Sequence, residues 1–221
     1  MTLLKEEVFR IMGKYYGNAH YRDAIRLSYS ENDLITTTRM LDEINALGYN
    51  FSNLYRLTDH EDLRFIPIVL EYFAQFESDL FRNGLLQAFN YRSYSEYTPT
   101  LIALYNDSKY ESLRFEISNA LFDIRNKKYI PLYMEIVTAS DYAERPDIVM
   151  NILCKFKVKE CLPKLMDYLH LYPEKWTFKF LQYAYCFNDD CVIPDILEAL
   201  NGDDREYRSM AKKALNKILK K

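Results

Sequence analysis

Proline recurs along this chain at an almost constant interval of 32, 32, 32 and 31 residues. The recurring positions are Pro67, Pro99, Pro131, Pro163 and Pro194. Each one opens a short string of mostly apolar residues, such as Ile-Pro-Leu-Tyr-Met at 130–134. Self-similarity at a period of this size is typical of stacked repeats, in which each repeat is one supersecondary unit. The spacing constrains the fold strongly, but it names neither a reaction nor a ligand.

Each repeat contains two apolar segments with helical spacing. Ahead of the prolines lie strings such as the one at 115–124, in which Ile117, Leu121 and Ile124 fall on one helical face. The proline itself fits as the first or second residue of a helix, because its missing N–H would be unpaired there and its fixed φ suits a helix. Each repeat is therefore expected to form helix A, a short turn and helix B.

This frame places the expected helices along the chain. A and B helices are expected in pairs at 79–90 and 95–106, 110–124 and 128–138, 142–156 and 159–170, and 175–187 and 191–200. A closing helix is expected at 204–219, and a helix at 62–75 with a short one at 51–58 before it. Residues 1–47 are expected to hold further helices at 2–13, 20–29 and 32–47, with Gly48 ending the last of them.

The predicted fold is all-α: an α-α superhelix, or α-solenoid, of about six helical-hairpin repeats. The repeats cover 61–221 with a period of about 32 residues, and 1–60 form a divergent N-terminal helical cap. Terminal units of stacked repeats are often atypical because one of their faces meets water. Residues 1–221 are expected to form one domain, since 221 residues suffice for a single core.

The repeat resembles the short HEAT-like repeats of the phycobilisome-lyase type found in bacterial proteins. The motif is an Arg, a small residue in an apolar helix A, and an Ile-Pro-x-Leu opening of helix B. The matching segments are Arg114 to Ala120 with Ile130-Pro131-Leu132, Leu162-Pro163-Lys164-Leu165, Ile193-Pro194-Asp195-Ile196 and Arg208 to Leu215. The resemblance covers about 63–219. It implies the armadillo-like α-solenoid fold and is unspecific for function. The tetratricopeptide and ankyrin signatures do not recur.

Charge and segment patterns limit the partners that the sequence favours. The formal net charge is −3, and the basic residues gather only near the C-terminus, where lysines also suit a helix dipole. A nucleic-acid partner is therefore disfavoured, because phosphate contact needs concentrated positive charge. The first residues resemble no signal peptide, and no apolar stretch is long enough to span a membrane. We expect a soluble cytoplasmic protein without membrane contact.

The four cysteines, Cys154, Cys161, Cys186 and Cys191, form no C-x-x-C pair. Cys154 and Cys186 are one period apart and are expected at equivalent core positions. A zinc site built from stacked repeats stays open as an alternative, although structural zinc sites usually show closely spaced ligands. No cofactor and no metal are expected.

The residue four places after each proline is acidic in four of the five repeats. These positions are Glu71, Ala103, Glu135, Asp167 and Glu198, and the following ones are Tyr72, Leu104, Ile136, Tyr168 and Ala199. Because B helices generally line the concave side of a solenoid, stacking would place the acids in one column. The predicted partner-binding residues are Glu71, Tyr72, Glu135, Asp167, Tyr168 and Glu198. The expected partner is a basic or amphipathic segment of another protein. The alternative is a solvated helix face.

Arg82, Arg114 and Arg208 recur at matching places in the repeat and have two interpretations. Stacked together, they could bind an anion. Alternatively, they pair with acids in the turns, such as Asp79, Asp107 or Asp204, and join neighbouring repeats.

Signs of catalysis are sparse, so we expect a non-enzymatic scaffold or adaptor. The histidines are His20, His60 and His170, and they lie in different repeats. No phosphate loop, nucleophile elbow or zinc-protease helix is present. An inhibitor or immunity role against a basic protein is a narrower form of the scaffold hypothesis. The alternative from another class is a HEAT-like alkylpurine DNA glycosylase, which shares the fold but presents a basic groove.

Overall fold

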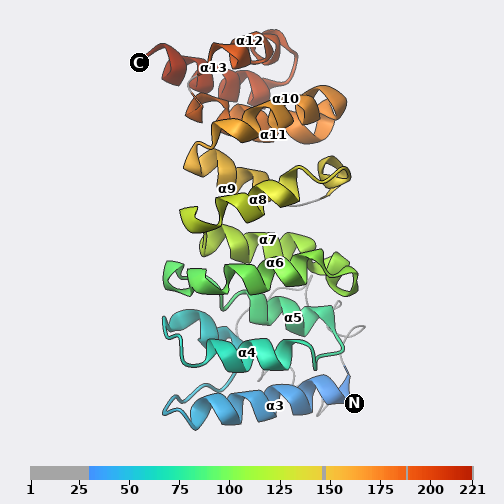
Figure 1. The fold of residues 1–221 in the computed structure, drawn as a ribbon, viewed down its shortest axis with the longest axis vertical. Helices are drawn as coiled ribbons and strands as arrows, with labels where there is room; N and C mark the ends of the chain where they lie inside the picture. Colours follow the sequence, from blue (N-terminus) through green and yellow to red (C-terminus); the bar gives the residue numbers. More distant parts are fainter. Residues whose placement is uncertain (1–29, 146–147, 188, 221) are drawn as a thin grey trace. The chain divides into compact units, whose positions relative to one another are not determined.

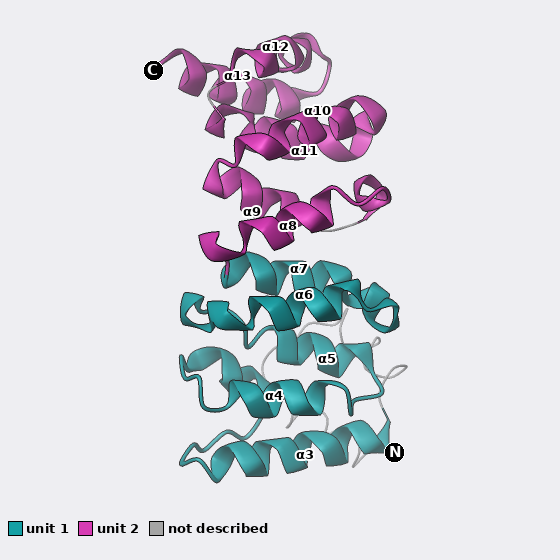
Figure 2. Cartoon of the chain, viewed as in Figure 1, with its two compact units in different colours: residues 1–124 teal, residues 125–221 magenta. Residues whose placement is uncertain are grey.

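The computed structural model describes residues 30–145, 148–187 and 189–220, and every regular element within these ranges is helical (Figure 1). The all-α prediction is confirmed for this part of the chain. The helices predicted at 2–13 and 20–29 lie outside the described residues. The chain divides into two compact units, Met1–Ile124 and Arg125–Lys221 (Figure 2). This division does not test the single-domain prediction for 1–221, which stays a prediction.

Five of the described helices carry the recurring prolines. These proline helices are α4 (Ile66–Phe73), α6 (Thr98–Asn106), α8 (Ile130–Val137), α10 (Leu162–Leu171) and α12 (Ile193–Asn201). Each begins at the residue directly before its proline, so the proline is always the second helical residue. At that position no intrahelical partner exists for a backbone N–H, and the ring costs the helix nothing. The predicted place of the prolines is confirmed.

The remaining α-helices alternate with the proline helices. They are α3 (Glu31–Asn45), α5 (Asp79–Leu86), α7 (Arg114–Asp123), α9 (Val149–Phe156), α11 (Pro173–Tyr183) and α13 (Arg205–Leu219). Short 3₁₀ turns lie in most of the connections: η2 (Leu54–Asp59), η3 (Arg92–Tyr97), η4 (Ser108–Leu113), η5 (Lys127–Tyr129), η6 (Tyr142–Glu144), η7 (Lys159–Cys161), η8 (Ala184–Cys186) and η9 (Asp190–Val192). The helices predicted at 79–90, 110–124 and 142–156 are thus shorter, because 3₁₀ turns or bends replace their ends.

The close helical pairs differ from the predicted ones. From α6 onward, each proline helix packs against the helix that follows it: α6 on α7, α8 on α9, α10 on α11 and α12 on α13. The repeat pattern in the sequence predicts instead that each proline helix pairs with the helix before it. The first proline helix, α4, contacts α5 but packs mainly against α3, the helix before it. From α6 onward the packed hairpin therefore begins with the proline helix, and the boundary between the two units falls between hairpins, after α7.

Hydrogen bonds at about the repeat distance join successive hairpins within each unit. In unit 1 the Tyr94 hydroxyl donates to the His60 carbonyl over 2.9 Å and accepts from the Asp62 N–H over 2.7 Å. In unit 2 the Tyr168 hydroxyl donates to the Val137 carbonyl over 2.5 Å. These partners are 31 to 34 residues apart. Tyr94 and Tyr168 thus bury their rings while their hydroxyls satisfy backbone groups of the preceding repeat.

Trp176, on α11, occupies the interior of unit 2. Its indole Nε1–H donates to the Ala143 carbonyl over 3.1 Å, and that carbonyl belongs to the preceding hairpin. The ring centroid lies 5.0 Å from Tyr168 and 5.9 Å from Tyr142, and all three rings are buried. This aromatic cluster fixes the position of α10, on which two of the predicted site residues lie.

Candidate binding site on the proline helices

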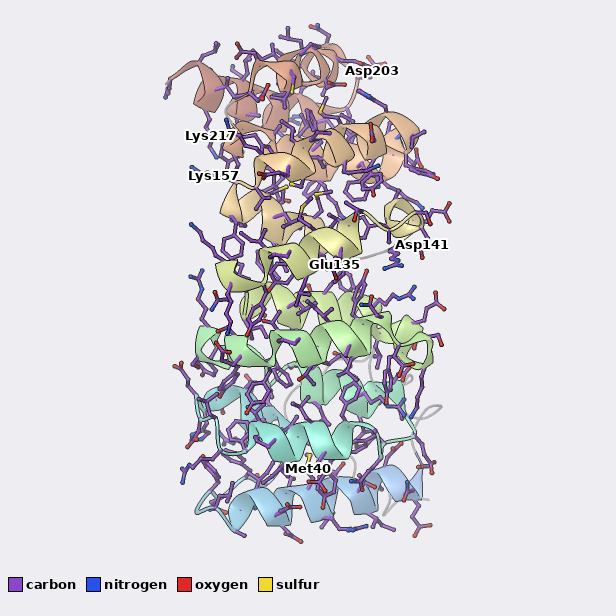
Figure 3. The ribbon with its side chains drawn as sticks, in the orientation of Figure 1. Met40, Glu135, Asp141, Lys157, Asp203 and Lys217 are labelled. Atoms are coloured by element: carbon purple, nitrogen blue, oxygen red, sulfur yellow. The ribbon has the colours of Figure 1, made fainter. Side chains whose placement is uncertain are left out.

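The carboxylates of the predicted site reach the surface. Glu71, Glu135, Asp167 and Glu198 are all exposed, on α4, α8, α10 and α12. Glu135 is labelled on α8 in Figure 3. Since each proline is the second residue of its helix, each acid is the sixth, and the acids share one position relative to the helix start. We call these four side chains the acid row.

Most of the acid row lacks a compensating charge. The carboxylates of Glu71, Glu135 and Glu198 form no ion pair with any residue that the structure describes. Asp167 approaches Lys164 Nζ at 3.5 Å, a long contact between two exposed groups. Exposed pairs of this kind contribute little to stability. The row therefore carries negative charge that the described residues leave largely unneutralised.

The two tyrosines of the predicted site are part of the interior. Tyr72 and Tyr168 are each only 6% exposed. Burial raises the pKa of Tyr72, with a hydrogen bond to Glu43 adding to the effect. A residue one place along a helix is rotated by about 100°, which turns it from the acid row into the hairpin packing. The surface position expected for Tyr72 and Tyr168 is therefore wrong, and of the six predicted residues only the four carboxylates are exposed. Contact of these residues with a partner stays a prediction.

Three acids of the row belong to unit 2 and lie on successive proline helices, α8, α10 and α12. The Tyr168–Val137 hydrogen bond joins α10 to the end of α8. His170 Nε2 lies 2.7 Å from Asp195 Oδ1 and joins α10 to α12. Glu135, Asp167 and Glu198 thus sit on neighbouring helices of one unit. Glu71 lies in unit 1 and is described only within that unit.

Two surface pockets of unit 2 adjoin the row. One, of about 390 Å³, includes Glu198, Asp195 and His170 in its wall. The other, of about 400 Å³, includes Asp167, Lys164 and the same His170. The proline period gives no signal for Asp195 or His170, because neither residue type recurs at its repeat position. Sequence reasoning had missed both.

The recurring arginines bind the ends of proline helices. Arg82 Nε donates to the Phe73 carbonyl over 3.4 Å, and Arg114 Nε donates to the Tyr105 carbonyl over 3.3 Å. Both carbonyls stand six places after a proline, where a helix leaves its acceptors unpaired. Arg208 donates likewise to the Gly202 carbonyl, over 2.8 Å, just after α12.

The predicted acidic partners of these arginines are partly right. Arg82 pairs with Asp79 over 2.6 Å, as predicted. Arg114 pairs with Glu111 rather than Asp107, whose carboxylate instead accepts the N–H of Lys109. Asp204 is also unavailable to Arg208, because it caps α13 by accepting the N–H groups of Glu206 and Tyr207. The guanidinium groups thus bond to acceptors of the protein itself. This supports the interpretation of the arginines as structural residues over their interpretation as an anion-binding site.

The cysteines and histidines provide no catalytic constellation within the described residues. Cys154 and Cys161 are buried, and the hydrogen bond between them, together with burial, raises the pKa of the Cys154 thiol well above its usual value. No group of three or more His, Cys, Asp or Glu side chains in the described ranges is placed to hold a metal ion. His60 packs against the Phe51 ring at 4.9 Å in unit 1, and His20 lies outside the described residues.

Comparison of the chain with protein-family models, with curated proteins and with solved structures gave no match. Among the described residues, no helix has the length and apolar character needed to cross a membrane.

Proposed function

We propose that the chain is a non-enzymatic HEAT-like α-solenoid that binds a basic or amphipathic segment of another protein along its acid row. The observation that carries the proposal is the row itself. An exposed carboxylate occupies the same place in four proline helices, and three of the four have no ion pair among the described residues.

Helix electrostatics argue against a merely solvated face. Glu71, Glu135 and Glu198 each lie within the last four residues of their helices, which end at Phe73, Val137 and Asn201. Negative charge is unfavourable at that end of a helix, because the backbone carbonyls already carry partial negative charge there. Helix stability thus does not account for these acids, whereas a cationic partner would.

The hairpin organisation supports the solenoid part of the proposal. Proline-helix hairpins follow one another, and hydrogen bonds at about the repeat distance join them within each unit. Stacked helical repeats present equivalent positions side by side, and such surfaces bind extended or helical segments of partners. An acidic row would also accelerate the encounter with a basic partner.

The same row argues against the DNA-glycosylase alternative. A duplex would bring phosphates against unneutralised carboxylates, whereas binding of a nucleic acid needs concentrated lysine and arginine. An inhibitor or immunity role against a basic protein remains one form of the proposal, since the acidic surface suits such a target.

The test is capture of the partner from native lysate by the full chain and by a charge-reversed variant. The variant changes Glu71, Glu135, Asp167 and Glu198 to Lys. We expect wild type to capture a protein with a basic segment, and the variant to lose it while keeping its helical circular dichroism. The captured protein would then be purified, and its affinity for both chains measured directly across salt concentration, because ion pairing weakens as salt screens it.

A matched control carries the same change of net charge at residues that lie outside the proline helices. It replaces Glu61, Glu160, Asp190 and Asp203, which are all exposed, by Lys. This control should bind the partner nearly as well as wild type. Equal binding by the charge-reversed variant, or tight salt-sensitive binding of duplex DNA by wild type, would contradict the proposed function.

A further inference from the structure

We infer that the pocket formed by α10, α11 and α12 receives one arginine side chain of the partner. The inference rests on the proposed function and assigns a ligand chemistry to one point of the acid row. The pocket measures about 390 Å³, and α12 contributes Asp195, Glu198 and Ala199 to its wall.

One part of the pocket wall is apolar. Leu169, Pro173, Phe180 and Ala199 line it, and Leu169 and Phe180 are buried in the hairpin packing. Arginine carries a chain of methylene groups that packs on apolar surface while its charged head reaches a polar group. A wall of this kind therefore suits the stem of the side chain.

The other part of the wall carries negative charge. The Asp195 side chain is only 15% exposed, and its Oδ1 lies 2.7 Å from His170 Nε2. Glu198 forms no ion pair with a described residue. No lysine or arginine among the described residues lines the pocket, so His170 is the sole basic side chain there. Apolar neighbours lower the local dielectric and strengthen attraction for a cation.

The arrangement of the carboxylates favours arginine over lysine. Asp195 and Glu198 are three residues apart on α12, so both stand on one side of that helix. A guanidinium presents several N–H donors in a planar fork and can serve two carboxylates at once, whereas an ammonium acts as a compact point charge. Asp195 is also favourable for the start of α12, but Glu198 near its end is not. The charge of Glu198 thus points to a cationic ligand.

The test uses the full chain and three small probes: acetylated, amidated arginine, citrulline and lysine. Citrulline has the shape of arginine without the charge. Binding is followed by amide chemical shifts in NMR. We expect arginine to shift the signals of Thr177, Ala199 and Gly202, which line the pocket, and citrulline to leave them unchanged. Lysine should bind more weakly than arginine.

Two variants separate charge from shape. Glu198→Gln should weaken arginine binding by about fivefold, the effect of losing one partly exposed charge pair. Ala199→Leu fills the pocket without changing charge and should abolish binding. Glu160→Gln, an exposed acid on η7 that lies outside the pocket, should have no effect. Equal shifts with citrulline, equal binding of lysine, or arginine binding unaffected by Ala199→Leu would each overturn the inference.

The two proposals can fail separately. If arginine does not bind while the charge-reversed variant still loses the partner, the pocket inference is wrong and the proposed function along the acid row is supported. If arginine binds the pocket while the charge-reversed and control variants capture the partner equally, the proposed function falls.

Discussion

Lys157 ends α9 in a conformation that ordinary side chains avoid. Its φ of 59° and ψ of 41° lie in the left-handed region. Among the described residues, Lys157 alone combines a positive φ with a side chain other than that of glycine. Its N–H donates to the Cys154 carbonyl over 3.0 Å, and the next N–H, of Val158, donates to the Leu153 carbonyl over 3.1 Å. This bonding pattern closes the helix and usually places glycine at the turning residue.

Replacing Lys157 by Gly should therefore stabilise the protein. We expect the free energy of unfolding to rise by about 1 kcal/mol, because the left-handed conformation costs glycine little. Lys155→Gly, two residues earlier inside α9, is the matched control and should lower it by about 1 kcal/mol. Urea unfolding followed by circular dichroism measures both. A loss of stability in both variants would show that Lys157 is not strained.

The sequence predicted the exposure of individual side chains less well than the positions of the helices. Counting from the proline identified the acid row, and the side chains of Glu71 and Glu135 are exposed as expected. The same counting assigned Tyr72 and Tyr168 to the surface, yet both are buried. A signal was available, since every residue at that repeat position is apolar or aromatic, which is typical of core.

At the scale of the helix, we expect the acid row to lower the free energy of unfolding by a measurable amount. Glu71, Glu135 and Glu198 stand near the carbonyl ends of α4, α8 and α12, where their charges oppose the helix dipoles. Changing all three to Gln should raise the free energy of unfolding by about 1 kcal/mol in total at low salt. The same variant should bind the partner less well.

The control for this prediction is an acid at the favourable end of a helix. Glu206 lies in the first turn of α13 and is exposed, so Glu206→Gln should lower the stability by about 0.5 kcal/mol. High salt should diminish both effects, because it screens exposed charges. A triple variant less stable than wild type would mean that these acids serve the fold, which would favour the solvated-face interpretation.

The position of each proline at the start of its helix was predictable, and the packing partners of the helices were not. The start of each proline helix follows from the chemistry of one residue, because proline is tolerated only where no N–H bond is required. The partner of a helix depends on which faces meet across a turn, and a period of 32 residues fits either neighbour equally well. The pairing of α6 with α7, and its equivalents, therefore became known only from the packing. The pocket beside Asp195 likewise depends on tertiary structure.

At the scale of the whole molecule, the repeat period accounts for the bonds between hairpins. The Tyr94–His60, Trp176–Ala143 and Tyr168–Val137 bonds all span about one period. Contacts of this kind reach only the neighbouring repeat, so each hairpin depends mainly on the ones beside it. The proposed solenoid extends the same relation along the full chain, and the acid row depends on it.

Small-angle X-ray scattering of the full chain tests this central proposal directly. A compact globular chain of 221 residues has a radius of gyration of about 17 Å. Hairpins stacked in one direction should give a clearly larger radius and a pair-distance distribution with a single maximum and a long tail. A radius near 17 Å with a symmetric distribution, or two separate maxima from two globular parts, would contradict the solenoid and the continuous acid row.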